Sequence, residues 1–201
     1  MPSENSFLSP AELKQVGFAA LGENVLISRH ARFYAPERIS LGNHVRIDDF
    51  CVLSAGDGAI KIGSYFHLSC ACLLYGAGGI TIGDFSAISS RCAVYSLSDD
   101  FSGETPANPM LPATVRRNVT LAPVVLGDHV MVGTASTLLP GVTLATGCAV
   151  GAHSMVVLPC QEWTIYSGNP ARPRGPRSKN LLQEIKKIGP PTGSHDPIIE
   201  P

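Results

Sequence analysis

The sequence predicts an all-β protein built as a parallel β-helix, and its six-residue repeat carries that prediction. The stretch 126–161 divides into six hexapeptides that each begin with an aliphatic residue and have a small or β-branched residue at the fifth position. A period of six fits neither an α-helix, with about 3.6 residues per turn, nor a half-buried strand, with a period of about 2. It fits a coil of three short flat faces, in which the first position points into a triangular prism.

The same register extends back through most of the chain. Further sets of three hexapeptides begin with aliphatic-glycine pairs at Leu21, Leu41, Ile62 and Ile82, and the pair recurs at Leu126. All 18 first positions in six such sets are apolar. In a chain that is 44% hydrophobic, chance gives this result with a probability on the order of 10⁻⁶. Successive coils are therefore expected to stack, with corners or bulges absorbing the few extra residues.

Five of the six cysteines occupy fifth positions, where a small apolar side chain is needed. Cys51, Cys72 and Cys92 are 21 and 20 residues apart, so we expect them to stack on one face. Cys148 and Cys160 occupy the same position in later hexapeptides. We therefore interpret these cysteines as packing residues and not as a disulfide or metal framework.

Length and charge exclude several classes of protein. A chain of 201 residues is one domain, or a solenoid with short caps. Its net charge of −1 gives no sign of a nucleic-acid surface or a basic membrane-binding face. It contains no apolar run of about 18 residues and no signal-peptide pattern, which predicts a soluble cytoplasmic protein without a membrane span.

Short helices are expected to cap both ends of the coils. Residues 1–20 form the N-terminal cap, with a helix over about 10–16 that starts at Ser9, Pro10 and Glu12. Residues 21–172 form the β-helix domain, and 173–201 hold a C-terminal helix and a disordered tail. The expected helix spans 179–188 after Ser178, and it has one apolar stripe formed by Leu181, Leu182, Ile185 and Ile188.

One long insertion interrupts the repeat. About two dozen residues leave the coil over 100–124, and they include four prolines and two arginines without a helical period. Proline fixes φ and stiffens the chain, so this loop is expected to be ordered. Long loops on rigid scaffolds are where binding and catalytic residues concentrate.

These features together resemble a known family. The hexapeptide repeats, the loop after the fourth coil, the segment Val150-Gly151-Ala152-His153-Ser154 and the ending Gly168-Asn169-Pro170-Ala171-Arg172 resemble the hexapeptide-repeat acyltransferases. The chain looks most like the sugar O- and N-acetyltransferases of the galactoside/maltose acetyltransferase type found in surface-polysaccharide pathways. The resemblance covers roughly 10–188. It implies a left-handed β-helix, whereas the usual crossover rule predicts the opposite hand.

The resemblance also implies a homotrimer whose active sites lie in the grooves between neighbouring prisms, with acetyl-CoA along the C-terminal coils and no metal. The positions that match the family's cofactor-binding residues are Gly133, Thr134, Gly151, Ala152, Pro170 and Arg172. Arg174 and Lys179 are further candidates for phosphate contacts. The alternatives are that both arginines are solvated and that the glycines are structural corners of the repeat.

The catalytic base of the galactoside-type enzymes is a histidine at the junction of coil and loop, and Asp99 takes its place here, followed by Asp100. Either aspartate is a candidate base if its pKa is raised. His129, in the coil after the loop, is a second candidate. A third explanation is that an amine acceptor needs no strong base, so that the aspartates orient it and accept its proton late. The competing interpretation is a turn with Asx hydrogen bonds.

Taken together, the sequence predicts an acetyl-CoA-dependent acetyltransferase acting on a hydroxyl or amino group of a sugar or nucleotide-linked sugar, in surface-polysaccharide biosynthesis. The alternative is a non-catalytic or metal-binding β-helix, either a scaffold or a γ-carbonic-anhydrase-like protein. The latter needs three histidines brought together. The paired spacing of that class is absent from His44, His67, His129 and His153.

Overall fold

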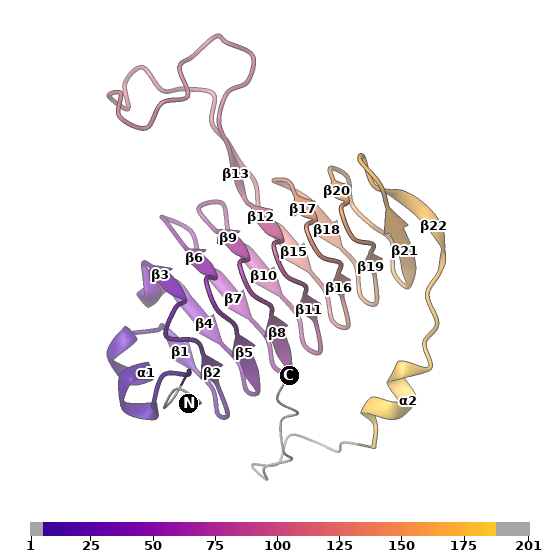
Figure 1. Ribbon diagram of the computed structural model, residues 1–201. Coiled ribbons are helices and arrows are strands. Elements are labelled where there is room, and N and C mark those ends of the chain that lie inside the picture. The colour runs from indigo at the N-terminus through magenta and orange to yellow at the C-terminus, as the bar shows by residue number, and fades with distance from the viewer. Residues whose placement is uncertain (1–5, 188–201) are drawn as a thin grey trace.

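The computed structural model describes residues 6–187 and has the predicted architecture, a left-handed parallel β-helix (Figure 1). Three sheets form the sides of a triangular prism, and the chain visits them in turn. We name these sheets face 1, face 2 and face 3. Corner 1/2, corner 2/3 and corner 3/1 are the turns that join them in chain order.

Each face is a ladder of short parallel strands, except that the last strand of face 2, β22, pairs antiparallel with β21. Face 1 contains β1 (Ala20–Leu21), β4 (Ile39–Leu41), β7 (Ile60–Ile62), β10 (Ile80–Ile82), β15 (Val124–Leu126) and β18 (Thr143–Leu144). Face 2 contains β2 (Leu26–Ile27), β5 (Val45–Ile47), β8 (Phe66–Leu68), β11 (Ala87–Ile88), β16 (Met131–Val132), β19 (Ala149–Val150), β21 (Thr164–Ser167) and β22 (Arg172–Pro176). Face 3 contains β3 (Arg32–Tyr34), β6 (Val52–Ser54), β9 (Leu73–Tyr75), β12 (Ala93–Tyr95), β17 (Thr137–Leu138) and β20 (Met155–Val156).

The register of these strands follows the hexapeptide rule. Leu41, Ile62, Ile82, Leu126 and Leu144 form one continuous row of partners along face 1. All five side chains are buried in the prism. The sequence repeat therefore predicted both the pairing and the inward direction of the first position.

Close approach between coils explains the glycine in each aliphatic-glycine pair. A β-carbon on Gly63 would lie 2.4 Å from Asp84 Oδ1 and 2.9 Å from the carbonyl carbon of Gly83. The same carbon on Gly42 would lie 2.7 Å from the carbonyl carbon of Gly63. Since real β-carbons do not approach so closely, only glycine allows these coils to stack.

Corner 1/2 carries an aromatic ladder, which we define as His44, Tyr65, Phe85, His129 and Trp163. The rings of His44 and Tyr65 lie 4.6 Å apart, those of Tyr65 and Phe85 4.7 Å, and those of Phe85 and His129 5.3 Å. All five residues have positive φ, which costs about 1 kcal/mol or more for a bulky residue. Backbone hydrogen bonds between coils, such as Phe85 N to Ser64 O at 2.9 Å, hold these turns in place.

The cysteines predicted to point inward are buried, and all six are free thiols. Cys51, Cys72 and Cys92 stack beside corner 2/3, and each Sγ donates to a backbone carbonyl of the next coil, at 3.0, 3.1 and 3.1 Å. The neighbouring Cys51 and Cys92 thiols, together with burial, raise the pKa of Cys72. The thiol column thus fills the core at this corner, as expected.

The N-terminal cap is confirmed as an α-helix, α1 (Pro10–Val16), with a reciprocal bond between Ser9 and Glu12. At the other end, α2 (Leu181–Ile185) is shorter than the expected helix and begins after Asn180 without a side-chain cap. None of its residues is fully buried, and the apolar side chains of Leu181, Leu182 and Ile185 are half-buried. Ile188 and the tail 189–201, which was expected to be disordered, lie outside the described residues.

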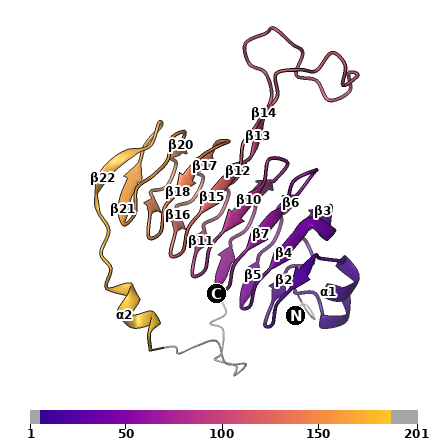
Figure 2. The same ribbon diagram turned by 180° about the vertical axis from the view of Figure 1, so that it is seen from behind.

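The predicted insertion is present, and it leaves the prism at corner 3/1 after β12. Its base is a two-stranded antiparallel ribbon of β13 (Leu97–Ser98) and β14 (Thr120–Leu121). A 3-10 helix, η1 (Pro36–Arg38), lies at the same corner in the first coil. Figures 1 and 2 show the loop projecting away from the coils of its own chain.

Replacing Gly63 with alanine is expected to destabilise the prism by about 1–3 kcal/mol, the usual effect of overpacking. Urea denaturation at fixed protein concentration measures it. Gly175→Ala is the matched control, because a β-carbon there meets nothing within 4 Å. Equal stability of the two variants would contradict the steric explanation.

Candidate active site

The loop is fastened at its base by Asp100. Its Oδ1 accepts from Ser102 N at 2.8 Å and from Ser102 Oγ at 2.5 Å, while Oδ2 accepts from Thr105 N and Thr105 Oγ1, both at 2.9 Å. These donors, the Ser102 hydroxyl first, lower the pKa of Asp100. A carboxylate with a lowered pKa and four short hydrogen bonds is a poor general base. The Asx-turn interpretation therefore fits Asp100, and its candidacy as a base is not supported.

Asp99 is placed differently from its neighbour. It is half-buried at the exit from corner 3/1, and its backbone carbonyl accepts from Ser98 Oγ at 3.2 Å. Within residues 6–187, no hydrogen bond of its carboxylate is recorded. Of the two aspartates at the junction, Asp99 is thus the one with a carboxylate available to a ligand.

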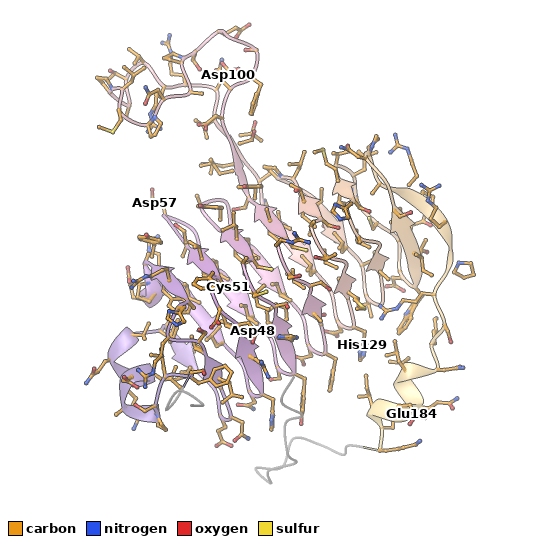
Figure 3. The ribbon with its side chains drawn as sticks, viewed as in Figure 1. Asp48, Cys51, Asp57, Asp100, His129 and Glu184 are labelled. Atoms are coloured by element: carbon orange, nitrogen blue, oxygen red, sulfur yellow. The ribbon has the colours of Figure 1, made fainter. Side chains whose placement is uncertain are left out.

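His129 lies in the aromatic ladder and not beside the aspartates. It sits at corner 1/2, with its ring against Phe85 and 6.1 Å from the ring of Trp163. Its Nδ1 is inaccessible and has no partner among the described residues. Figure 3 shows His129 and Asp100 on opposite sides of the prism. Within one chain, the candidate base His129 does not share a groove with the two aspartates, because His129 lies at corner 1/2 and the aspartates lie at corner 3/1.

Four of the predicted cofactor-binding residues meet at corner 2/3. Gly133 and Thr134 lie in one coil, and Gly151 and Ala152 lie directly above them, with Gly133 N donating to Val150 O at 2.7 Å. A β-carbon on Gly133 would lie 2.5 Å from Ala152 N, and one on Gly151 would lie 3.0 Å from Ser167 Cβ. Coil stacking therefore requires Gly133 to be glycine whether or not a ligand binds there.

Two serines at the same corner were not among the predicted site residues. Ser89 and Ser90 occupy the hexapeptide positions that Gly133 and Thr134 occupy one coil later. Ser90 Oγ lies 3.1 Å from Thr134 Oγ1, which also donates to Ser90 O at 2.7 Å. No hydrogen bond of the Ser89 hydroxyl is recorded within residues 6–187. The repeat register was the available signal, since it aligns these serines with the predicted cofactor residues.

The remaining candidates lie above the last coil. The turn containing Pro170 covers corner 2/3, where Ala171 N donates to Met155 O at 2.8 Å. Arg172 is exposed, whereas Arg174 donates to Ser167 Oγ at 2.8 Å and to Ser167 O at 3.1 Å. Lys179 Nζ lies 5.4 Å from the centre of the Trp163 ring, at corner 1/2. Pro170, Arg172 and the Ser167-bonded Arg174 thus extend the corner 2/3 group, whereas Lys179 lies at another corner.

A groove of about 390 Å³ lies elsewhere, on the outer side of face 2. Its wall includes the rings of His44, Tyr65 and Phe85 together with Arg46 and His67. Asp48 lies between these two side chains, accepting from Arg46 Nε at 2.7 Å and lying 2.7 Å from His67 Nε2. None of the predicted site residues lines this groove.

Residues 6–187 were also compared with the arrangements that metal binding and membrane crossing require. No group of three or more His, Cys, Asp or Glu side chains is arranged to hold a metal ion in that range. In the same range, neither α-helix has the length and hydropathy of a membrane-crossing segment.

Comparison with known proteins establishes the class. The chain is 42% identical over 191 residues to the dTDP-4-amino-4,6-dideoxy-D-glucose acyltransferase of Escherichia coli, covering 95% of this chain and 98% of that protein. The structure superimposes with a TM-score of 0.87 on a serine variant of AntD, an N-acyltransferase from Bacillus cereus, at 42% identity over 92% of this chain and 98% of that one. That structure contains dTDP-4-amino-4,6-dideoxyglucose and coenzyme A.

A more distant neighbour is a maltose O-acetyltransferase from Clostridium difficile, with a TM-score of 0.54 and 19% identity over 84% of this chain and 75% of that one, which supports the fold alone. No family model matches the sequence. The prism and its loop are those of a hexapeptide-repeat acyltransferase. Within that class, the chain belongs to the family of the Escherichia coli dTDP-4-amino-4,6-dideoxy-D-glucose acyltransferase.

Removing the Asp100 carboxylate is expected to loosen the base of the loop and leave the prism intact. Because the pKa of Asp100 is lowered, its stabilising effect is complete above the ordinary carboxyl pKa of about 4 and is lost as the pH falls below it. In Asp100→Ala at pH 7, the amides of Ser102 and Thr105 should exchange hydrogen at least tenfold faster. Exposed Asp57 supplies the control, Asp57→Ala. Unchanged exchange would rule out the fastening role.

Proposed function

We propose that the protein transfers an acyl group from an acyl-CoA thioester to the amino group of a nucleotide-linked amino sugar, in a pathway that supplies a surface polysaccharide. The observation that carries this proposal is the combination of a free Asp99 at the loop junction with membership of an acyltransferase family that includes the Escherichia coli enzyme. Acetyl-CoA is the donor expected from the sequence. Because AntD has been crystallised with dTDP and 3-hydroxybutyryl-CoA, that thioester is the second donor to test.

An amine acceptor suits the carboxylate at this junction. The amine nitrogen attacks the thioester carbonyl carbon, the carbon-sulfur bond breaks from a tetrahedral intermediate, and coenzyme A leaves as its thiolate. Asp99 would orient the amino group and accept a proton as the new bond forms. A carboxylate is too weak a base for a sugar hydroxyl, whereas a neutral amine is already nucleophilic.

Substituted forms of AntD support a serine-aspartate pair. Its structures with dTDP or the dTDP-sugar include variants at one serine and one aspartate that are ten residues apart. In this chain the same spacing joins Ser89 to Asp99 and Ser90 to Asp100. The Asp100 carboxylate is hydrogen-bonded within the loop turn, and the Ser90 hydroxyl lies in hydrogen-bonding distance of Thr134. We therefore favour Ser89 and Asp99 as the pair that contacts the amino group of the acceptor.

Such a pair requires two copies of the chain. Asp99 leaves the prism at corner 3/1, whereas Ser89 and Gly133 lie at corner 2/3, the other edge of face 3. A site that contains both forms when corner 3/1 of one copy meets corner 2/3 of the next. In a closed ring this brings face 1 of each copy against face 2 of its neighbour and turns corner 1/2 toward the axis. We propose three copies, as in the family that the sequence resembles.

Surface properties support this arrangement. Met131 and Ile165, on the outer side of face 2, are 49% and 39% exposed in the single chain. The aromatic ladder and the groove beside it lie at the edge that would approach the axis. On the loop, the exposed fractions of Phe101 and Met110 are 91% and 88%, and contact with a neighbouring copy would cover such side chains.

In this ring, acyl-CoA would lie along corner 2/3 of the C-terminal coils. Gly133, Thr134, Gly151 and Ala152 would line its pantetheine arm, and Pro170 and Arg172 would lie beside its phosphates. Arg174 and Lys179 contribute less under this proposal, because Arg174 is bonded to Ser167 and Lys179 lies over Trp163. His129 would lie near the ring axis and away from the reacting groups.

Asp99→Asn is expected to lower kcat at least tenfold with little change in the melting temperature, and Ser89→Ala is expected to lower it as well. Refolding a one-to-one mixture of the two impaired variants should return about a quarter of the sites to wild-type composition and so to wild-type activity, since each site would take one residue from each of two copies. Coenzyme A release with dTDP-4-amino-4,6-dideoxyglucose measures it. Wild-type kcat in Asp99→Asn would exclude that residue, and the absence of restored activity would exclude a shared site.

Arg172→Ala is expected to raise the KM for acyl-CoA at least fivefold while changing kcat less, because an arginine that contacts the nucleotide phosphates acts on binding. Arg32→Ala, on the outer side of face 3, is the control. An unchanged KM for acyl-CoA would contradict the phosphate contact.

A further inference from the structure

Arg177 joins the chain just after β22 to corner 1/2. Its Nη1 contacts three backbone carbonyl oxygens, those of His129 at 2.6 Å, Gly147 at 3.1 Å and Cys148 at 3.3 Å. Its backbone N–H donates to Trp163 O at 2.7 Å. The coils that contain β16, β19 and β21 are therefore all hydrogen-bonded to this one residue.

The guanidinium of Arg177 is partly removed from water. The residue is half-buried, and burial lowers its pKa, although an arginine stays protonated at neutral pH. Among residues 6–187, no carboxylate forms an ion pair with it. Its partners there are backbone carbonyls of the rigid prism, so the contact fixes the position of the chain that carries Arg177.

The strand before Arg177 is short of hydrogen-bond donors. β22 is the edge strand of face 2, beside β21 (Figure 1). Pro173 and Pro176 have no N–H to donate, and the register shifts between Ile165 and Tyr166. The pairing ends at Pro176, directly before Arg177. Arg177 thus supplies an attachment that the backbone of β22 does not provide.

β22 crosses the last coil from one corner to the other. It begins with Arg172 at corner 2/3, where Ala171 N donates to Met155 O at 2.8 Å, and Arg177 follows its other end at corner 1/2. The two arginines are five residues apart, or about 17 Å along an extended strand. Arg177 is therefore too distant to touch a phosphate that Arg172 contacts, but it fastens the opposite end of the same strand.

We propose that Arg177 is a positioning residue for acyl-CoA, because it fixes β22 at corner 1/2 and so holds Arg172 in place at corner 2/3. Without it, β22 would separate from β21 more readily, and ordering Arg172 on binding would cost more entropy. Ser89 and Asp99 lie in earlier parts of the chain and should keep their positions. This inference rests on the proposed function for the role of Arg172.

Calorimetry with coenzyme A tests this role independently of turnover. Arg177→Ala is expected to raise the Kd for coenzyme A at least fivefold. Arg177→Lys keeps the charge but not the planar fork, so it should raise the Kd at least twofold, and it carries the test if the alanine variant does not fold. The matched control is Arg38→Ala, because Arg38 Nη1 also donates to a carbonyl of the next coil, Asp57 O, at corner 3/1. This control should bind coenzyme A as the wild type does.

A double variant tests whether Arg177 acts through Arg172. If it does, Arg172→Ala combined with Arg177→Ala should raise the Kd for coenzyme A by clearly less than the product of the two single effects. In steady-state kinetics, Arg177→Ala should raise the KM for acyl-CoA at least fivefold. It should leave the KM for dTDP-4-amino-4,6-dideoxyglucose unchanged and lower kcat less than twofold.

The outcomes separate this inference from the proposed function. If acyl transfer continues and the Arg177 variants bind coenzyme A as tightly as the wild type, the positioning role is overturned and the proposed function stands. Equal weakening by Arg38→Ala, or single effects that multiply in the double variant, also overturns the role. If the Kd changes follow the expectation but the wild type transfers no acyl group, the proposed function fails and the positioning role stands. Wild type that binds no coenzyme A overturns the inference.

Discussion

Close stacking of successive coils is the constraint on which the rest of the structure depends. At corner 1/2 the backbones of successive coils lie very close together. A β-carbon added to Gly22, Gly42 or Gly63 would lie only 2.4–2.7 Å from the nearest heavy atom of the next coil. Neighbouring side chains then complete the contact, as when Asn43 Oδ1 accepts from Glu23 N and Asp84 Oδ1 accepts from Ser64 N. Glycine permits the approach, and the polar side chain beside it satisfies the backbone N–H of the coil before.

A scaffold stacked in this way leaves few places where chemistry can be added. Inward positions are filled by aliphatic side chains, thiols, small hydroxyls such as Ser86 and Ser136, and the ring of Phe66. The short strands allow no insertion without breaking the register. Function is therefore confined to the corners and to the one loop that leaves at corner 3/1. The corners differ from one another: corner 1/2 is aromatic, corner 2/3 combines small residues with Ser89 and Arg91, and corner 3/1 carries Asp99. A triangular section keeps these edges apart within one chain, which is why the proposed chemistry needs a neighbouring copy.

The two aspartates at the loop junction illustrate how local bonding separates residues that the sequence makes equivalent. The Asp100 carboxylate accepts from two backbone amides and two hydroxyls, so it stabilises the turn at the base of the loop. Asp99 lies one residue earlier, before the turn, and its carboxylate is not part of that network. A difference of one position thus decides which carboxylate is available to an acceptor.

The sequence by itself determined the coils, because a six-residue period with an apolar first position and a following glycine is satisfied only by a three-sided stack. It likewise determined helix α1, the inward cysteines and the position of the loop, since these follow from local spacing and capping. The tertiary structure alone decided which candidates meet. His129 and Lys179 lie at corner 1/2, and Ser89 lies beside Gly133 at corner 2/3. Asp100 is held in the turn at the base of the loop. The corner at which a residue lies depends on how many residues each preceding coil contains. The half-buried stripe of α2 has the same origin: an amphipathic pattern predicts a helix, but how far its apolar side is covered depends on what the folded chain places beside it.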